Sequence, residues 1–287
     1  MILQLILKML NRDRKGNIMK KGIRGHDIER QGLVNICERI REMGCSYIQL
    51  VLERSLEGFE QGKFTEEYAK SIKDALGDIK IAVFGSYINP ADRNPETLAQ
   101  SLAKFKEKIH YATVLNPIVV GTETGIYYDD DGNNANDTEE AYQHVLKSIR
   151  ELADEAEKCN VMIAVEGVHA FVINTPERLA RLVTDLNSDN VQVIFDPVNY
   201  INIDNYKDQD TMIKTMFELL SGKIAAIHAK DFEVTDGKIE RRIPGEGILN
   251  YKLIFDLMRK YNVDVPIISE EINDTYAVKG FANLELI

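Results

Sequence analysis

The second half of the chain contains four apolar runs, and each run ends in a side chain that can bind a metal ion. An apolar run that stops at a breaker is typical of a buried strand in a parallel sheet. An ionised carboxylate at the end of such a strand is costly unless it is paired or bound to a metal. We therefore predict four parallel strands whose ends share one polar site. The runs span 161–165, 191–195, 224–227 and 265–269, and the polar residues that follow or end them are Glu166, Asp196, His228 and Glu270.

Four earlier runs predict further strands, at 20–24, 47–52, 79–84 and 117–120. Helices are predicted over 33–43, 65–76, 208–220, 250–261 and 276–284, with three more beginning at Asn94, Thr138 and Thr175. Uniform alternation of strand and helix gives either a doubly wound sheet or a closed barrel. The count of eight strands favours a single (β/α)8 TIM barrel. In a barrel the carboxyl ends of all strands meet at one mouth, which would gather ligands from four successive strands.

The length of the chain favours one large domain. The 287 residues are close to the ~250 that are typical of such barrels. We expect residues 19–287 to form the barrel and residues 1–18 to form an N-terminal extension, which could serve as an oligomer contact. Its first ten residues are apolar but too short to span a bilayer. Charged residues follow this run, at the place where a signal peptide would have a cleavage site of small residues. The run is therefore expected to be neither a membrane span nor a signal peptide, and no membrane association is expected.

Charge and cysteine content narrow the class of protein further. The formal net charge of −11 is the wrong sign for a protein that grips phosphate backbones, so no nucleic-acid partner is expected. Cys37, Cys45 and Cys159 are odd in number, far apart and without a C-x-x-C pattern. They predict free thiols in a reducing compartment, and hence a cytoplasmic protein.

The four strand-end residues supply three carboxylates and one imidazole, and no thiolate belongs to the pattern. Such a mixed oxygen and nitrogen set suits one divalent metal ion. Its richness in oxygen favours Mn or Mg, while Co and Zn also accept these ligands.

At these residues the chain resembles the xylose isomerase-like TIM-barrel superfamily, the group of sugar-phosphate isomerases, epimerases and ketose 3-epimerases. The resemblance runs from about residue 19 to the end of the chain. It implies that Glu166, Asp196, His228 and Glu270 bind one divalent metal and that the two glutamates also act as acid and base. The segments that carry it are Glu166 at its strand end, 195–197 (FDP), 227–231 (IHAKD), 244–247 (PGEG) and 266–270 (PIISE).

Two positions depart from the pattern of relatives. Many relatives have Asp-x-x-His after strand six, whereas this chain has Asn199 at the fourth position. The apurinic-site endonucleases of this fold use that histidine, with others, to hold three zinc ions, and this chain has only five histidines. Strand two carries Gln49 where relatives often carry Glu, so substrate contacts are expected to differ.

Further polar residues lie near predicted strand ends. Lys230 could stabilise a developing oxyanion or contact a hydroxyl, and His228 should stay neutral, with its second nitrogen held by an acceptor. Arg241 or Arg242 could meet a phosphate or a distal hydroxyl. Glu270 and Glu271 are adjacent, so only one can point inward, and the spacing favours Glu270. The predicted substrate-binding residues are His26, Glu123, His169, Asn199, Lys230 and Arg242.

The predicted reaction is proton transfer next to the carbonyl of a small sugar, ketose or sugar phosphate. A divalent metal would polarise the carbonyl as a Lewis acid, and Glu166 and Glu270 would remove and return a proton by way of an enediolate. An isomerase or epimerase of carbohydrate metabolism is therefore expected. Three alternatives stay open: a metal-dependent dehydratase or lyase on a polyol-derived ketone, an endonuclease for abasic-site DNA, and a non-catalytic sugar-binding barrel that regulates a partner.

Overall fold

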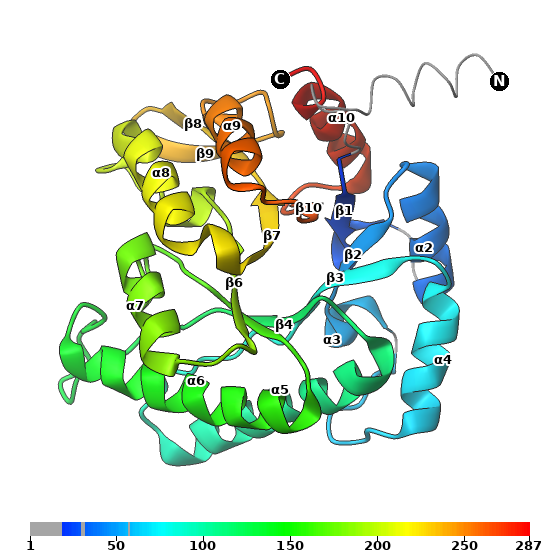
Figure 1. Cartoon of the computed structure of the whole chain (residues 1–287), viewed down its shortest axis with the longest axis vertical. Coiled ribbons are helices and arrows are strands. Elements are labelled where there is room, and N and C mark those ends of the chain that lie inside the picture. Colours follow the sequence, from blue (N-terminus) through cyan, green and yellow to red (C-terminus); the bar gives the residue numbers. More distant parts are fainter. Residues whose placement is uncertain (1–18, 30–31, 57) are drawn as a thin grey trace.

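Eight parallel strands close into a barrel in the computed structural model, which describes residues 19–29, 32–56 and 58–287 (Figure 1). Strand β1 pairs in parallel with β2 on one side and with β10 on the other, which closes the ring. The predicted single (β/α)8 barrel is therefore confirmed. The predicted extension over residues 1–18 lies outside the described residues. The barrel strands are β1 (Lys21–Arg24), β2 (Tyr47–Leu50), β3 (Lys80–Gly85), β4 (Val119–Thr122), β5 (Ile163–Glu166), β6 (Val191–Phe195), β7 (Ile224–Ala229) and β10 (Ile267–Ser269).

Helices surround the strands (Figure 1), and four of them begin where the sequence predicts caps. The Thr65, Thr138 and Thr175 hydroxyls each accept a backbone N–H of the first turn, as does the Asn94 side chain. Within the described ranges, no helix is long and apolar enough to cross a bilayer. The main helices are α2 (Leu33–Glu42), α4 (Glu66–Leu76), α5 (Pro95–Leu115), α6 (Glu139–Cys159), α7 (Pro176–Leu186), α8 (Gln209–Leu220), α9 (Tyr251–Tyr261) and α10 (Asp274–Leu284), and the short ones are α3 (Leu52–Ser55), η1 (Gly25–Asp27), η2 (Val198–Tyr200), η3 (Tyr206–Asp208) and η4 (Ser221–Lys223).

Four helices end in an asparagine with a left-handed backbone. These residues are Asn116, Asn160, Asn187 and Asn262, with φ between 44° and 60°. Asparagine tolerates this conformation better than most residues, and its backbone N–H closes the last helical turn. Each of the four connections leads directly into the next barrel strand, at the end of the barrel opposite the mouth.

Two elements differ from the sequence-based expectation. Strand β2 stops at Leu50, because the chain turns into the short helix α3 where an extension of the strand was expected. An antiparallel hairpin, β8 (Asp231–Thr235) and β9 (Lys238–Arg242), follows β7 and was not predicted. Its two-residue turn is Asp236-Gly237, with φ of 50° and 73°. Asp-Gly between alternating residues is a strong hairpin signal, so the sequence did contain the information.

The side chains inside the barrel set the direction of the site residues. Val83, Val119, Ala164, Ile194, Ala225 and Ala226 pack together as a cluster separate from the layer between strands and helices. Gly121 leaves space in this cluster, because a Cβ there would lie 2.7 Å from Ile194 Cδ1 and 2.8 Å from Val83 Cγ1. Side chains alternate between the two faces of a strand. The residues two positions beyond Ala164, Ile194 and Ala226 therefore also point inward, at the mouth.

Candidate metal centre and active site

The inward positions at the mouth are occupied by the predicted ligands. Counting two residues on from the inward-facing Ala164, Ile194 and Ala226 gives Glu166, Asp196 and His228. The fourth, Glu270, follows the last residue of β10. All four side chains are buried. The alternation of strand side chains thus brings together residues that are more than 100 positions apart in the sequence.

The imidazole of His228 faces the three carboxylates. Its Nδ1 lies 3.3 Å from Glu166 Oε1, 3.6 Å from Asp196 Oδ2 and 3.5 Å from Glu270 Oε2. One ligand atom each from Glu166, Asp196 and His228 lies within 4.8 Å of the other two. The structure therefore brings the four predicted ligands around one point.

This cluster fits a divalent cation. Its donor set is three carboxylate oxygens and one imidazole nitrogen, which suits Mg, Mn, Co or Zn. Within the described residues, the buried Asp196 Oδ2 has no hydrogen bond of good geometry. Three buried carboxylates that converge on one another are costly unless positive charge offsets them, and the single charge of the nearby Lys230 offsets only part of theirs. Glu166, Asp196, His228 and Glu270 are therefore the residues that would hold the divalent cation.

Lys230 lies inside the site and not on its rim. Its side chain is buried, and its Nζ lies 2.9 Å from Asp196 Oδ2 and 2.8 Å from Glu270 Oε2. The same ammonium lies 3.0 Å from Glu271 Oε1. Burial lowers the pKa of Lys230, but the surrounding carboxylates outweigh burial and raise it. Lys230 is thus a fixed positive charge beside the two carboxylates from β6 and β10.

Asn199 connects two of the functional groups. Its Nδ2 donates to Glu166 Oε1 at 2.7 Å, and its Oδ1 accepts from Lys230 Nζ at 3.3 Å. The backbone N–H of Asn199 donates to Asp196 Oδ1 at 3.1 Å. Asn199, which stands where many relatives carry a histidine, therefore orients the carboxylate of Glu166 in this chain.

Glu270 is held by residues from the next two strands of the ring, β1 and β2. Arg24 Nη1 donates to Glu270 Oε1 at 3.1 Å, and Gln49 Nε2 donates to the same oxygen at 3.0 Å. The Gln49 amide also donates to the Tyr87 hydroxyl at 2.7 Å. Asp27 fixes Arg24 through two hydrogen bonds of 2.9 Å. Arg24 and Tyr87 were not predicted from the sequence: the contact of Arg24 with Glu270 depends on closure of the barrel between β1 and β10, and that of Tyr87 with Gln49 depends on how the ends of β2 and β3 meet.

The environments of the two glutamates push their pKa values in opposite directions. Burial raises the pKa of Glu166 by more than its contact with His228 lowers it. Burial also acts on Glu270, but His228, Lys230 and Arg24 outweigh it and lower the pKa of Glu270. Separated pKa values of this kind are what an acid and base pair needs.

Glu123 follows β4 and belongs to the same electrostatic cluster. Burial raises its pKa to about 7, and the negative charges of Glu166 and Glu270 add to this effect. A carboxyl group of that kind can exchange a proton near neutral pH, which agrees with a place at the substrate-binding mouth.

The two histidines predicted near the mouth lie at its edge. His26 lies in η1 after β1, where burial, Arg24 and Arg54 lower its pKa to about 4. His169 is exposed, and its backbone N–H donates to the carbonyl of Asn199 at 2.7 Å. His169 Nδ1 lies 3.1 Å from the same carbonyl oxygen. Both histidines thus border residues of the cluster: the ring of His26 contacts Arg54, and the ring of His169 contacts the carbonyl of Asn199.

Two expectations need correction. Arg242 is not brought to the predicted ligands, because its guanidinium is engaged on the hairpin by Glu233 on the neighbouring strand β8 and by Glu240 on its own strand β9. Arg241 has the opposite orientation, and its Nε lies 2.8 Å from Glu271 Oε2. The expected acceptor for the second nitrogen of His228 is also missing, since Nε2 has no hydrogen-bond partner within the described residues.

Comparison with known proteins agrees with this architecture. The family model described as xylose isomerase-like TIM barrel matches residues 37–285. A D-psicose 3-epimerase of Enterocloster bolteae is 20% identical over 226 residues, which cover 78% of this chain and 69% of the relative. An inosose dehydratase of Glaesserella parasuis is 22% identical over 268 residues, which cover 82% of this chain and 88% of the relative.

A solved structure shows the same fold. The IolI protein, whose crystal structure has a binding zinc atom, superposes with a TM-score of 0.71 and 19% sequence identity. The superposition covers 93% of this chain and 94% of that chain. Since the family model spans most of the chain and the barrel is closed as that family requires, this protein belongs to the xylose isomerase-like TIM barrel family.

Proposed function

We propose that this protein is a divalent-metal-dependent enzyme that isomerises or epimerises a small sugar, ketose or sugar phosphate. The proposed step is proton transfer at the carbon next to a carbonyl. Family membership and the sugar-converting relatives support an enzyme of this general type. The substrate, its phosphorylation and the direction of the reaction are more specific than this general type, and they belong to the proposal alone.

One observation carries the proposal. Glu166 and Glu270 come from β5 and β10, which lie on different sides of the ring, yet both carboxylates approach His228 Nδ1, at 3.3 and 3.5 Å. Two carboxylates that reach one point from different directions can address two faces of a small bound molecule. One glutamate can then take the proton from carbon and the other can return it.

The metal would supply Lewis-acid polarisation of the carbonyl when bound. Glu166, Asp196, His228 and Glu270 would hold it, and their oxygen-rich set favours Mn or Mg over Co or Zn.

The remaining polar residues position the two glutamates and offer charge to the substrate. Asn199 holds Glu166, while Arg24 and Gln49 hold Glu270. The ammonium of Lys230, beside both Asp196 and Glu270, is placed to stabilise negative charge on a substrate oxygen. Glu123, with its pKa of about 7, can bind a hydroxyl or relay a proton.

The test is isotope exchange with a panel of ketoses and ketose phosphates in deuterium oxide with Mn²⁺. We expect deuterium at the carbon next to the carbonyl of one substrate class. Glu166→Gln and Glu270→Gln should each slow this exchange by about 10²–10⁴-fold, the usual contribution of a general acid or base. Metal content and far-ultraviolet circular dichroism separate loss of chemistry from loss of the ion or of the fold.

Glu66→Gln is the matched control, since Glu66 is an exposed carboxylate on α4 paired with Lys70. It should exchange at the wild-type rate. Full exchange in both site variants would rule out the acid and base assignment.

The match to an inosose dehydratase over 88% of that relative favours a second candidate. The same base would then lead to expulsion of hydroxide from a polyol-derived ketone. Mass analysis of the product distinguishes the two, because a dehydratase product is lighter by one water. Cytoplasmic location, homo-oligomer formation and the lack of a nucleic-acid partner stay predictions.

A further inference from the structure

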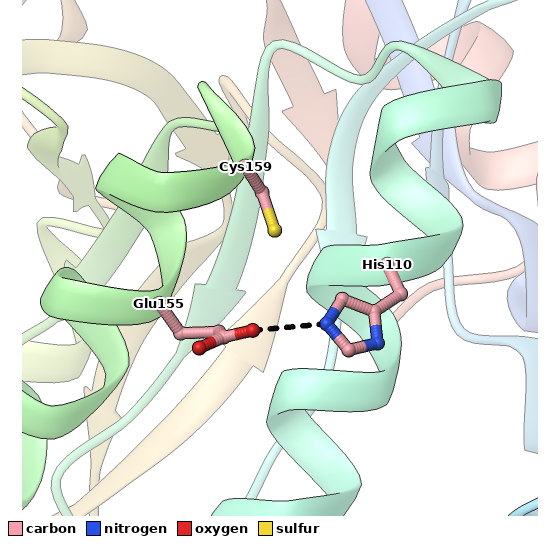
Figure 2. Close-up of side chains that lie close together, drawn as sticks. All are labelled: His110, Glu155 and Cys159. Carbon is pink, nitrogen blue, oxygen red and sulfur yellow. Dashed lines mark hydrogen bonds and ion pairs between the residues drawn. The ribbon is translucent and has the colours of Figure 1, made fainter.

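A second group of metal-binding side chains lies outside the barrel, between α5 and α6. Figure 2 shows His110 on α5 directed at Glu155 and Cys159 on α6. His110 Nε2 lies 3.0 Å from Glu155 Oε1. One nitrogen, one oxygen and one sulfur of these three residues all lie within 4.8 Å of one another. No residue of this group contributes to the site at the mouth.

The two helices hold these side chains in register. Lys106 Nζ lies 2.7 Å from Glu151 Oε1, and His110 contacts Glu155 one turn further along. Both contacts join residues 45 positions apart. Because this separation stays the same from one turn to the next, α5 and α6 run side by side in the same direction over this stretch. Glu155 and Cys159 are four residues apart and therefore share one face of α6.

The group is open to a cation from solvent. The His110 side chain is 47% exposed and that of Glu155 is 21% exposed. Cys159 is only partly buried, whereas Cys37 and Cys45 are buried in the core. Lys158 lies 3.3 Å from Glu155 Oε2, which leaves Oε1 directed at the histidine.

We propose that His110, Glu155 and Cys159 form a zinc site that joins α5 to α6. Zinc takes imidazole, carboxylate and thiolate ligands at about 2.0–2.3 Å in a tetrahedral arrangement. The three ligand atoms lie within 4.8 Å of one another, so only small side-chain rotations are needed to bring them around one ion, and all three side chains are at least partly exposed. Water completes the fourth position, and the thiol proton passes to solvent when the sulfur binds.

The ligand set distinguishes this site from the one at the mouth. The mouth offers three carboxylates and one imidazole, which favours Mn or Mg, whereas a thiolate selects softer ions such as zinc. The two sites should therefore take up different metals from a mixture. This inference does not depend on the proposed catalytic function.

Cobalt titration of the metal-free protein is the direct test, because thiolate-bound Co²⁺ shows charge-transfer absorption in the near ultraviolet. We expect this band in the wild-type protein and its loss in Cys159→Ser. Asp196→Asn, which alters the mouth, should keep the band, as should Lys106→Ala, which removes only the neighbouring interhelical pair. A missing wild-type band, or a band that persists in Cys159→Ser, overturns the proposal.

Zinc competition with a chromophoric chelator gives a second readout. His110→Gln and Cys159→Ser should each weaken one zinc-binding event by at least about 10-fold, the low end of what loss of even a supporting residue costs a metal site. Zinc should also raise the Tm of the wild-type protein more than that of either variant. Equal zinc affinity in His110→Gln and the wild type contradicts the site, with circular dichroism confirming that the variants fold.

Discussion

Asn199 shows how one side chain can support two functional groups. It donates to the carboxylate of Glu166 at 2.7 Å and accepts from the ammonium of Lys230 at 3.3 Å. A hydrogen bond to a charged group contributes about 1.5–3 kcal/mol. Removal of the Asn199 side chain would free the Glu166 carboxylate to rotate and would leave the Lys230 ammonium with one hydrogen-bond acceptor fewer.

We expect Asn199→Ala to lower kcat by about 10–100-fold, which is the kinetic equivalent of one such hydrogen bond. KM should change little, because the lost contact is to the enzyme's own carboxylate. Steady-state kinetics of the exchange reaction measures both constants. Asn174→Ala, which removes an exposed contact to Asp137, is the control and should match the wild type. Equal losses in both variants would contradict the positioning role.

The raised pKa of Glu123 predicts that the stability of the metal-free protein depends on pH. That pKa is about 7 in the folded state, against an ordinary value of 4.5. The folded state therefore binds more protons than the unfolded state between these values, and stability falls as pH rises through this window. Glu123→Gln should remove this loss, so the variant should be more stable than the wild type at pH 8, by up to about 3 kcal/mol.

Urea denaturation at pH 4.5 and pH 8 tests this expectation, and the two proteins should differ only at the higher pH. Added Mn²⁺ should reduce the difference, since a cation offsets the repulsion from Glu166 and Glu270. A variant that is less stable than the wild type at pH 8 would show that the charged form of Glu123 is favoured in the fold.

At the scale of elements, the hairpin of β8 and β9 is tied to the mouth at its base. Asp231 accepts backbone N–H groups from Gly245 and Gly247 on Oδ2, at 2.8 and 3.0 Å. Its Oδ1 accepts those of Phe232 and Leu249, at 2.8 and 3.0 Å. Arg241 and Lys230 meet at Glu271, which links the hairpin to the site. One buried carboxylate therefore organises the whole loop that follows the hairpin.

Asp231→Asn should lower the free energy of unfolding by about 1–3 kcal/mol, because an amide NH2 would face N–H donors that then lack an acceptor. Chemical denaturation measures the change. Asp236→Asn is the control, since Asp236 lies in the exposed turn with φ of 50°, a conformation that asparagine also adopts. A loss confined to the control would show that the turn, and not Asp231, limits stability.

The elements also show what a sequence can predict. The strand ends at Glu166, Asp196 and His228 follow from apolar runs and a period of two, which are local properties. The contacts of Arg24 and Gln49 with Glu270 depend on barrel closure, which no local pattern specifies. The choice between Arg241 and Arg242 depended on the hairpin register, because a shift of one residue exchanges the faces of a strand.

At the scale of the whole molecule, the metal should link chemistry to stability. The four ligands come from β5, β6, β7 and the end of β10, so an ion held by them joins half of the ring. A ligand at 100 times its Kd stabilises a fold by about 2.7 kcal/mol. At about 2–4 °C per kcal/mol for a protein of this size class, saturating Mn²⁺ should raise Tm by about 5–10 °C.

Thermal unfolding after chelation and after return of Mn²⁺ measures this effect. Asp196→Asn should abolish the response to Mn²⁺. Cys159→Ser should retain it, because the thiolate-containing group between α5 and α6 does not favour that ion. A response that survives in Asp196→Asn would place the Mn²⁺ elsewhere in the protein.

The asparagine caps at Asn116, Asn160, Asn187 and Asn262 have a practical consequence. Each fixes a helix-to-strand return by its own local backbone, at the end of the barrel opposite the mouth and away from the four predicted ligands there; Asn160 directly follows Cys159 of the proposed zinc site. An engineer who wants a hardier or re-linked version of this enzyme should therefore work at the end opposite the mouth, where turns can be rebuilt one at a time.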